Sequence, residues 1–229
     1  MKGFALHITT NMEYLPYLRV SLIACSVVLA NLALGLTANA GNVVSNPGFE
    51  DGKEKWGLFV PKDGEGMIDG FQISNEAPHS GVSSALMKLT GPGRCALNAN
   101  LIPVQPGERY RLTAWVKFSG NSVLTQGMPG AFIRATLMES AGKDIADPRR
   151  HMHIGLSGKM ARVDNVAKLA VSELPKQWTK IEGVIEIPAG TTIMGPALFV
   201  QGVTGDVSWD DVSVEAVPAN TPLSPEPSL

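Results

Sequence analysis

The stretch PGERYRLTAWVKF, residues 106–118, decides the fold of this chain. After a turn at Pro106 and Gly107, apolar and polar side chains alternate with a period of two. Successive side chains of a β-strand point to opposite faces of its sheet, so one set enters a core and the other faces away from it. The set predicted to point inward is Tyr110, Leu112, Ala114, Val116 and Phe118. The set predicted to point outward is Arg111, Thr113, Trp115 and Lys117.

The same period recurs from Gly41 to Val217, in short apolar stretches separated by Gly, Pro, Asn and Asp. Further strands are expected at residues 84–89, 131–138, 181–187, 196–200 and 212–214. The side chains expected to point inward on them include Ile133, Ala135, Leu137, Ile181, Ile185, Ile187, Val212 and Val214. No window shows a long helical period, and residues 140–177 are expected to form a long, partly basic loop or insertion. The pattern predicts an all-β fold, an antiparallel β-sandwich or barrel.

An apolar run from Val20 to Leu36 follows Arg19, and the small residues Ala38 and Ala40 come shortly after it. A signal peptidase reads small residues at these positions, so residues 1–40 are predicted to be a signal peptide. Two alternatives stay open. The run could be retained as a membrane anchor, or Cys25 could be the lipidated cysteine of a lipobox. Cleavage after Ala40 implies a protein that is secreted, periplasmic or at the cell surface, with no membrane contact once the signal is removed.

Three parts follow from this organisation: the signal peptide at 1–40, a single domain at 41–217, and a Pro-rich tail at 218–229 that is expected to be disordered. The chain carries 19 Lys and Arg residues against 21 Asp and Glu residues, which is not the charge balance of a nucleic-acid-binding protein. Of its 2 cysteines, only Cys95 lies outside the predicted signal, so the mature domain has no intramolecular disulfide. Cys95 is either a reactive thiol or a buried core residue.

Five sequence markers occur in a fixed order along the domain. They are NPGFEDG at 46–52 followed by Trp56, Ser80-Gly81, Pro106-Gly107, Trp178-Thr179-Lys180, and VSWDDVSVE at 207–215. In this order they resemble carbohydrate-binding modules of the family 4, 9, 16 and 22 kind, which share a galactose-binding-like jelly roll. The resemblance spans residues 42–216.

The resemblance implies an exported, non-catalytic, monomeric protein that binds a polysaccharide or oligosaccharide in a cleft on one sheet face. Two alternatives remain: a jelly-roll structural or assembly module that binds no sugar, and a jelly-roll enzyme such as a polysaccharide lyase or glycoside hydrolase. The sequence contains no G-x-S-x-G, H-E-x-x-H or phosphate-binding loop motif. A lyase would have to use Arg134, His151 or His153, and Lys117.

The resemblance also implies a structural calcium ion between the first segment and the last strand. Its ligands would be the carboxylates of Glu50 and Asp210 and the carbonyls of Gly48 and Gly81, oxygen ligands of the kind that calcium prefers. Strand alternation places Asp210 on the same face as Val212 and Val214, so its carboxylate is expected to point inward and to need a compensating partner. The alternative is a surface turn in which Asp210 caps backbone amides.

The predicted ligand face combines aromatic rings with hydrogen-bonding side chains on three strands. Its residues are Arg111, Trp115, Phe132, Arg134, Phe199 and Gln201. If the strands lie in one sheet, these residues form a surface that suits a sugar, with apolar rings beside donors. Alternatively, the rings are covered by residues 140–177 and form a second small core. His151 and His153 would share a face on a strand and suit a transition metal, or lie in a surface loop.

We expect the exported protein to begin at Gly41. The Ala38-Asn39-Ala40 site is the only junction in the leader at which small residues follow the whole apolar run. Intact-mass measurement of the exported protein checks this. A product that begins at a diacylated Cys25 would contradict both the cleavage site and the unanchored localisation.

Overall fold

The computed structural model describes residues 41–64, 67–125, 127–155, 160–163, 166–169 and 174–224. The predicted signal peptide, with Cys25, and residues 225–229 lie outside this part. No helix within the described ranges is long and apolar enough to cross a membrane.

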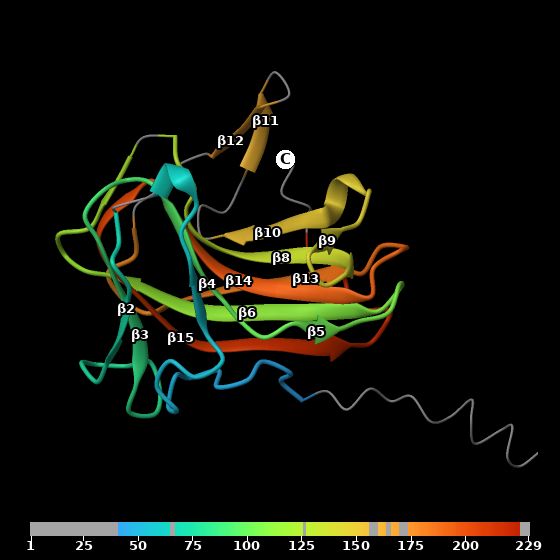
Figure 1. Ribbon diagram of the computed structural model, residues 1–229, viewed down its shortest axis with the longest axis horizontal. Coiled ribbons are helices and arrows are strands. Elements are labelled where there is room, and N and C mark those ends of the chain that lie inside the picture. The colour runs from blue at the N-terminus through green and yellow to red at the C-terminus, as the bar shows by residue number, and fades with distance from the viewer. Residues whose placement is uncertain are drawn as a thin grey trace, which may run out of the picture. The chain divides into compact units, whose positions relative to one another are not determined.

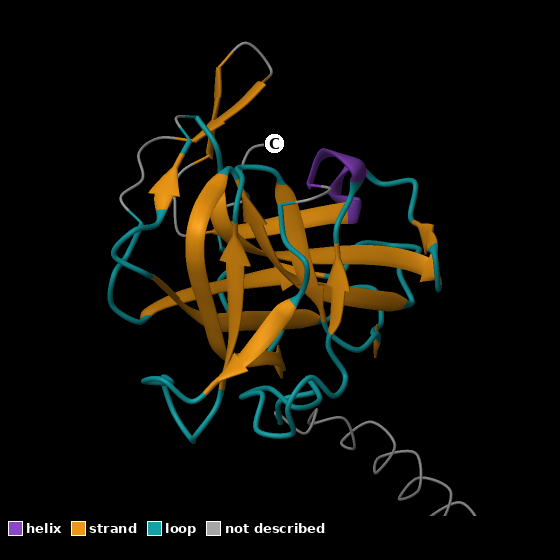
Figure 2. Cartoon of the chain, turned by 60° about the vertical axis from the view of Figure 1, so that its left-hand side comes forward, coloured by secondary structure: helices purple, strands orange, loops and turns teal. Residues whose placement is uncertain are grey.

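Two antiparallel sheets make up the domain (Figures 1 and 2). Sheet A has the strand order β1 (Gly57–Phe59), β4 (Arg94–Asn98), β14 (Ile193–Gln201), β8 (Gly130–Ser140) and β10 (His151–Gly155), with β5 (Ile102–Pro103) beside β14 and β9 (Lys143–Asp144) beside β8. Sheet B has the order β13 (Thr179–Glu186), β6 (Arg109–Phe118), β15 (Val203–Val217), β3 (Ser84–Leu89) and β2 (Phe71–Ser74), with β7 (Val123–Leu124) beside β15.

The remaining elements are small. Strands β11 (Met160–Val163) and β12 (Val166–Leu169) pair only with each other, and the 3₁₀ turns η1 (Lys62–Gly64) and η2 (Pro148–Arg150) are the helical elements of the described residues. The all-β prediction is confirmed, and the architecture is an antiparallel β-sandwich of the jelly-roll kind.

The core lies between the two sheets, where each strand buries every second side chain. All five inward residues predicted on β6 are buried, with Leu112, Ala114 and Val116 fully inaccessible at 0%. The inward residues predicted on the other strands are buried as well: Ile133, Ala135, Leu137, Ile181, Ile185, Ile187, Val212 and Val214. Burial of these apolar side chains is the main favourable term in folding, so the period of two in the sequence fixes which face of each strand lies inside.

A β-bulge in β15 reverses the expected orientation of Asp210. Asp210 lies opposite Trp115 of β6, and the register then shifts before Ser213 pairs with Thr113. Asp211, inside the bulge, has a φ of 45°. One extra residue on the bulged strand interrupts the alternation. The prediction that Asp210 shares an inward face with Val214 is therefore wrong, because Asp210 shares a side of the sheet with Trp115.

Residues 140–177 contain more structure than the predicted loop. Asp147 caps η2 by accepting a hydrogen bond from the Arg149 amide at 2.7 Å. β10 then pairs with β8 along its whole length, from the pair His151–Thr136 to the pair Gly155–Phe132. The prediction of one long loop or insertion is wrong here, because the segment supplies the edge strand of sheet A.

The first part of the predicted tail has a defined place beside β13. The Ser224 amide donates to the Val184 carbonyl at 3.0 Å, and the Val184 amide donates to Ser224 Oγ at 2.8 Å. Arg109 Nη1 also donates to the Thr221 carbonyl at 2.7 Å. Residues 218–224 thus lie along the free edge of sheet B, where the sequence predicted disorder.

Substitutions at the neighbours Leu137 and Thr136 test which face of β8 contributes more to the free energy of unfolding. Leu137 is fully buried, whereas Thr136 points to the other face. Leu137→Ala should lower the free energy of unfolding by roughly 2–5 kcal/mol through lost burial and the cavity left behind. Thr136→Ala, the matched control, should change it by no more than about 0.5 kcal/mol. Urea unfolding measures both, and equal effects would contradict the assigned parity.

Candidate functional site

The strand order divides the predicted ligand face between the two sheets. Arg111 and Trp115 lie on β6, in sheet B, whereas β8 and β14, which carry the other four predicted residues, are adjacent in sheet A. The prediction of one surface containing all six residues is therefore wrong. It assumed that the three strands share a sheet, and alternation within each strand carries no information on that point.

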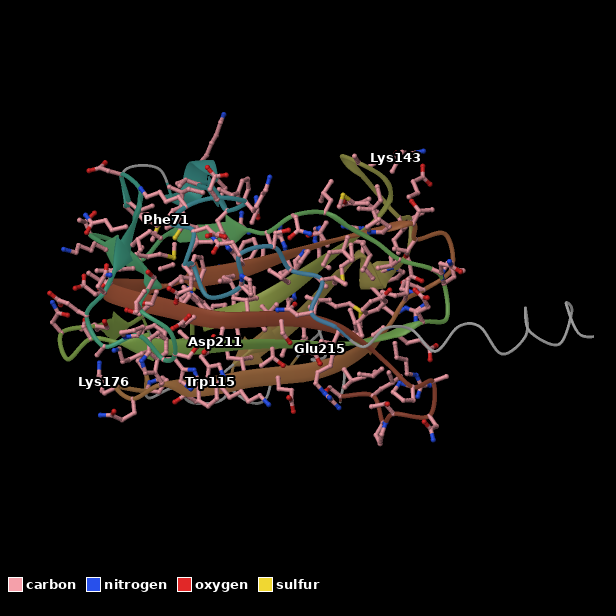
Figure 3. All side chains as sticks on the ribbon, turned by 90° about the horizontal axis from the view of Figure 1, so that it is seen from below. Phe71, Trp115, Lys143, Lys176, Asp211 and Glu215 are labelled. Carbon is pink, nitrogen blue, oxygen red and sulfur yellow. The ribbon has the colours of Figure 1, made fainter. Side chains whose placement is uncertain are left out.

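Trp115 is covered by the loop that precedes β3. The His79 ring stacks on Trp115 with centroids 3.7 Å apart, and Trp178 meets His79 edge-on at 5.9 Å. Lys117 Nζ and Trp178 Nε1 both donate to the Ala77 carbonyl at 3.0 Å. Figure 3 shows Trp115 on the same side of the molecule as Asp211, whose Oδ2 lies 2.5 Å from His79 Nδ1. Trp115 therefore belongs to a packed cluster that holds this loop.

Further charged residues on the outer face of sheet B form contacts as well. Arg111 Nε lies 4.0 Å from Glu182 Oε2, and Lys180 Nζ lies 2.6 Å from the same oxygen. Because Lys117 is on this sheet, it does not join Arg134 and the two histidines on sheet A. The residue set that a lyase would have required is split in the same way as the predicted ligand face.

Cross-strand pairing arranges the outer face of sheet A in rows, because directly opposite residues of antiparallel strands share a face. The first row is Phe59, Ala96, Phe199, Phe132 and Gly155. The second row is Gly57, Asn98, Ala197, Arg134 and His153. A third, shorter row is Arg94, Gln201 and Gly130. We call the surface formed by these three rows the sheet A face.

The aromatic rings of the sheet A face pack on one another. Phe132 and Phe199 stack with centroids 5.3 Å apart, and Phe59 approaches the edge of Phe199 at 6.5 Å. Phe199 is 1% exposed and Phe132 is 8% exposed, and with Ala96 and Ala197 they form a cluster separate from the main core. The predicted exposed stacking platform is thus wrong for these two rings, which form a second small core, while Phe59 stays 39% exposed.

Arg134 and His153 bring polar groups onto this apolar cluster. The Arg134 guanidinium lies over the Phe199 ring, with Cζ 4.0 Å from the centroid, and the His153 ring meets Phe132 edge-on at 5.2 Å. Arg134 Nε and His153 Nδ1 are both buried and have no hydrogen-bond partner among the described residues. Most buried polar atoms in folded proteins are paired, so two orphaned nitrogens on one face indicate a place for a ligand or ordered water.

Burial and neighbouring positive charges shift the pKa values of two groups on the sheet A face. Burial, followed by the charges of Arg134 and His151, lowers the pKa of His153 to about 4. Burial and the neighbouring charge of Arg94 lower the pKa of Arg134. His153 is therefore neutral near pH 7, where its ring offers one donor and one acceptor.

The two histidines lie on a strand, so the surface-loop interpretation is wrong and the shared face is confirmed. His151 Nε2 pairs with Asp144 Oδ2 at 3.1 Å, and burial lowers the pKa of His151. Within the described ranges, no group of three His, Cys, Asp or Glu side chains is placed to hold a metal ion. Cys95 is a core residue on the opposite side of β4, and burial raises its pKa to about 12, so it is not a reactive thiol.

The four residues predicted to hold calcium are brought together at one end of the sandwich. Glu50 Oε1 accepts hydrogen bonds from the Val82 amide at 3.0 Å and the Ser83 amide at 3.2 Å. Gly81 lies against the same carboxylate, because a Cβ built there would overlap Glu50 Oε1. A Cβ built on Gly48 would lie 3.7 Å from Asp210 Oδ1 and 3.7 Å from Glu50 Cγ.

Asp210 acts as an acceptor for backbone amides in this structure. Its Oδ2 accepts from the His79 amide at 2.8 Å and the Ser80 amide at 3.3 Å, and its Oδ1 accepts from the Asp211 amide at 2.8 Å. Burial nevertheless raises its pKa to about 6, with the Asp211 charge adding to the shift. A cation beside Asp210 would offset this cost, and carboxylates with glycine carbonyls are suitable calcium ligands, so calcium stays a prediction.

Comparisons with known proteins show the fold of the chain. No protein family and no curated protein matches it. Among solved structures it resembles the enzymatically active domain of tailspike protein 4 of Bacteriophage CBA120, at 15% identity over 77% of this chain and 21% of that chain, with a TM-score of 0.55. It also resembles a cyclase from Fischerella sp. TAU, at 14% identity over 79% of this chain and 100% of that chain, with a TM-score of 0.52. The chain thus spans about a fifth of the tailspike chain's length.

A family 16 carbohydrate-binding module also matches, at 15% identity over 76% of this chain and 99% of that chain, with a TM-score of 0.46. At these identities the tailspike and cyclase matches show a shared fold alone, and fold does not determine function.

The pKa of Asp210 gives a test of the predicted ion. A carboxyl group whose pKa is raised by folding destabilises the fold as it ionises. Without calcium, stability should therefore fall as the pH rises from 3.8, the ordinary value, to about 6. Asp210→Asn should remove this slope.

If calcium binds at Asp210, it should raise the melting temperature at pH 7.5, and a chelator should reverse the gain, because an ion that binds only the folded state stabilises it. Asp210→Asn should abolish this response. Melting curves of the parent that are the same in calcium and in chelator would refute the calcium site and leave the amide-capping role.

Proposed function

We propose that this protein is an exported, non-catalytic carbohydrate-binding protein that holds a polysaccharide or oligosaccharide on the sheet A face. The chemistry of that face supports carbohydrate binding, and the predicted signal peptide supports export of the protein. One observation carries it: Arg134 Nε and His153 Nδ1 are buried, lack partners among the described residues, and lie against the paired rings of Phe199 and Phe132.

A sugar requires this combination of groups. The CH-rich face of a pyranose ring packs against apolar or aromatic surface, while its hydroxyl groups need several donors and acceptors nearby. On the sheet A face the exposed ring is Phe59, and the second row adds the exposed side chain of Asn98 to Arg134 and His153. An amide, a guanidinium and an imidazole therefore lie in one row beside an aromatic row.

The dimensions of the second row suit an oligosaccharide. Asn98, Ala197, Arg134 and His153 lie on four consecutive strands of sheet A. Neighbouring strands are about 4.8 Å apart, so the row spans roughly 14 Å. Ala197 lies between Asn98 and Arg134, and its small side chain leaves the polar groups on each side accessible to a ligand. Such a row is longer than a single hexose ring.

Binding without catalysis fits the positions of the candidate acid and base groups. Of the residues that a lyase would use, Arg134 and the histidines lie on sheet A and Lys117 lies on sheet B. The matched tailspike domain and cyclase are described as enzymes, so the fold does not decide the question. Release of reducing ends or unsaturated products from polysaccharides by the purified protein would contradict the non-catalytic proposal.

Matched arginine variants on the two sheets test the binding face. Arg134→Met keeps an apolar stem over Phe199 and removes the guanidinium, whereas Arg111→Met makes the same change on sheet B. Loss of hydrogen bonds to a charged group costs about 1.5–3 kcal/mol, so Arg134→Met should weaken binding roughly 10- to 100-fold. Arg111→Met should bind like the parent.

Affinity electrophoresis of the mature protein in gels that contain xylans, β-glucans, galactans and pectins measures this effect. Equal loss in both variants, or loss in Arg111→Met alone, would remove the site from sheet A. A parent protein that no polysaccharide retards would favour the structural or assembly module instead.

A further inference from the structure

The sheet A face concentrates positive charge on a protein whose formal net charge is −2. Its charged and titratable groups are Arg94 on β4, Arg134 on β8, and His151 and His153 on β10, with Arg150 of η2 close enough to lower the pKa of His151. Asp144 of β9 pairs with His151, and its negative charge also acts on Arg134. The positive character of this face is therefore local.

Arg134 is the central charge of the set. Its guanidinium covers Phe199, which lies in the middle of the aromatic row, and it forms no ion pair among the described residues. Arg94 lies on the far side of that row, and its charge acts on Arg134 across it. The Arg134 guanidinium thus lies over the ring within the field of a second positive charge, and its Nε is buried without a partner among the described residues.

A neutral ligand would leave the charge of Arg134 without an ion-pair partner. Burying a charged group is costly unless it is paired and hydrogen-bonded, and like charges that approach each other in a partly buried site add to the cost. A hydroxyl group can accept a hydrogen bond from Arg134 but cannot neutralise the charge. A planar carboxylate or a sulfate can do both, because oxyanions match the fork of N–H donors on a guanidinium group.

We propose that the sheet A face recognises an acidic glycan, with the carboxylate or sulfate group of the saccharide bound at Arg134 beside Arg94. This inference rests on the proposed function and specifies the class of its ligand. The oxyanion would lie over the Phe199–Arg134 pair, and the sugar ring that bears it would lie along the row towards Asn98. His153, neutral near pH 7, would contribute one hydrogen bond to a ring hydroxyl.

Pairs of polysaccharides that differ only in charge test the inference. Polygalacturonate and its fully methyl-esterified form differ only in the carboxylate, and dextran sulfate and dextran differ only in the sulfate. The mature protein should bind the charged member of one pair at least 10-fold more tightly than its neutral counterpart in titration calorimetry. The preference should shrink as salt rises from 0.05 to 0.5 M, because salt screens charge pairing. The pair that shows the preference identifies the oxyanion.

Variants at Arg134 distinguish specific binding of an oxyanion at this residue from nonspecific electrostatic attraction of an acidic polymer. Arg134→Met should remove the preference for the charged polymer, Arg134→Lys should restore only part of it, and Arg111→Met should leave it intact. A charge preference that Arg134→Met does not change would overturn the inference, because the attraction would then be nonspecific. Equally tight binding to neutral and acidic polymers would overturn the inference but leave the proposed function standing. Binding to none of the neutral or acidic polymers would overturn both.

Discussion

Burial of every second side chain between two sheets is the constraint on which the rest of this structure depends. Leu112, Ile133 and Leu198 come from three strands and meet in one core. Because one face of each strand packs into that core, a ligand that binds to either sheet must contact the side chains of the other face. Among the side chains that point away from the core, Arg134 of β8 lies over Phe199 of β14. On β6 the outward-pointing Trp115 stacks against His79 in the loop before β3.

For the strands that it predicted, the sequence indicated which side enters the core, except before the bulge in β15, but it did not predict strand order. Alternation is a property of one strand, whereas the neighbours of a strand depend on contacts between distant segments. This explains why Arg134 and Trp115 were each given the correct parity and yet were wrongly joined in one site. The bulge at Asp211 is a second feature that the sequence did not predict. This one residue, with a φ of 45°, exchanges the faces to which the preceding side chains of β15 point, and the Asp210-Asp211 pair does not indicate a bulge.

The candidate site was predictable only in part. Arg134, Phe132 and Phe199 stand out because they are polar or aromatic at positions that face away from the core. His153 was recognised as a possible strand residue, but its strand is short and mixes histidine with methionine. Asn98 and Arg94 were missed, although Arg94, Ala96 and Asn98 alternate with the buried Cys95 and Leu97, which is the signal that would have identified β4. Their place beside Arg134 depends on β14, which lies about 100 positions further along the chain.

The hydrogen bonds between Ser224 and Val184 have a consequence for the pairing of sheet edges between copies of this protein. β13 is one of the two edge strands of sheet B, and an unprotected edge strand is a template on which another chain can extend the sheet. Ser224 occupies both main-chain groups of Val184, while Pro218 and Pro222 cannot offer the N–H groups that a continuing ladder would need. The proline-rich end of the described chain thus covers part of this edge, and we expect a protein trimmed at Val217 to expose the edge to strand pairing with other copies of the chain.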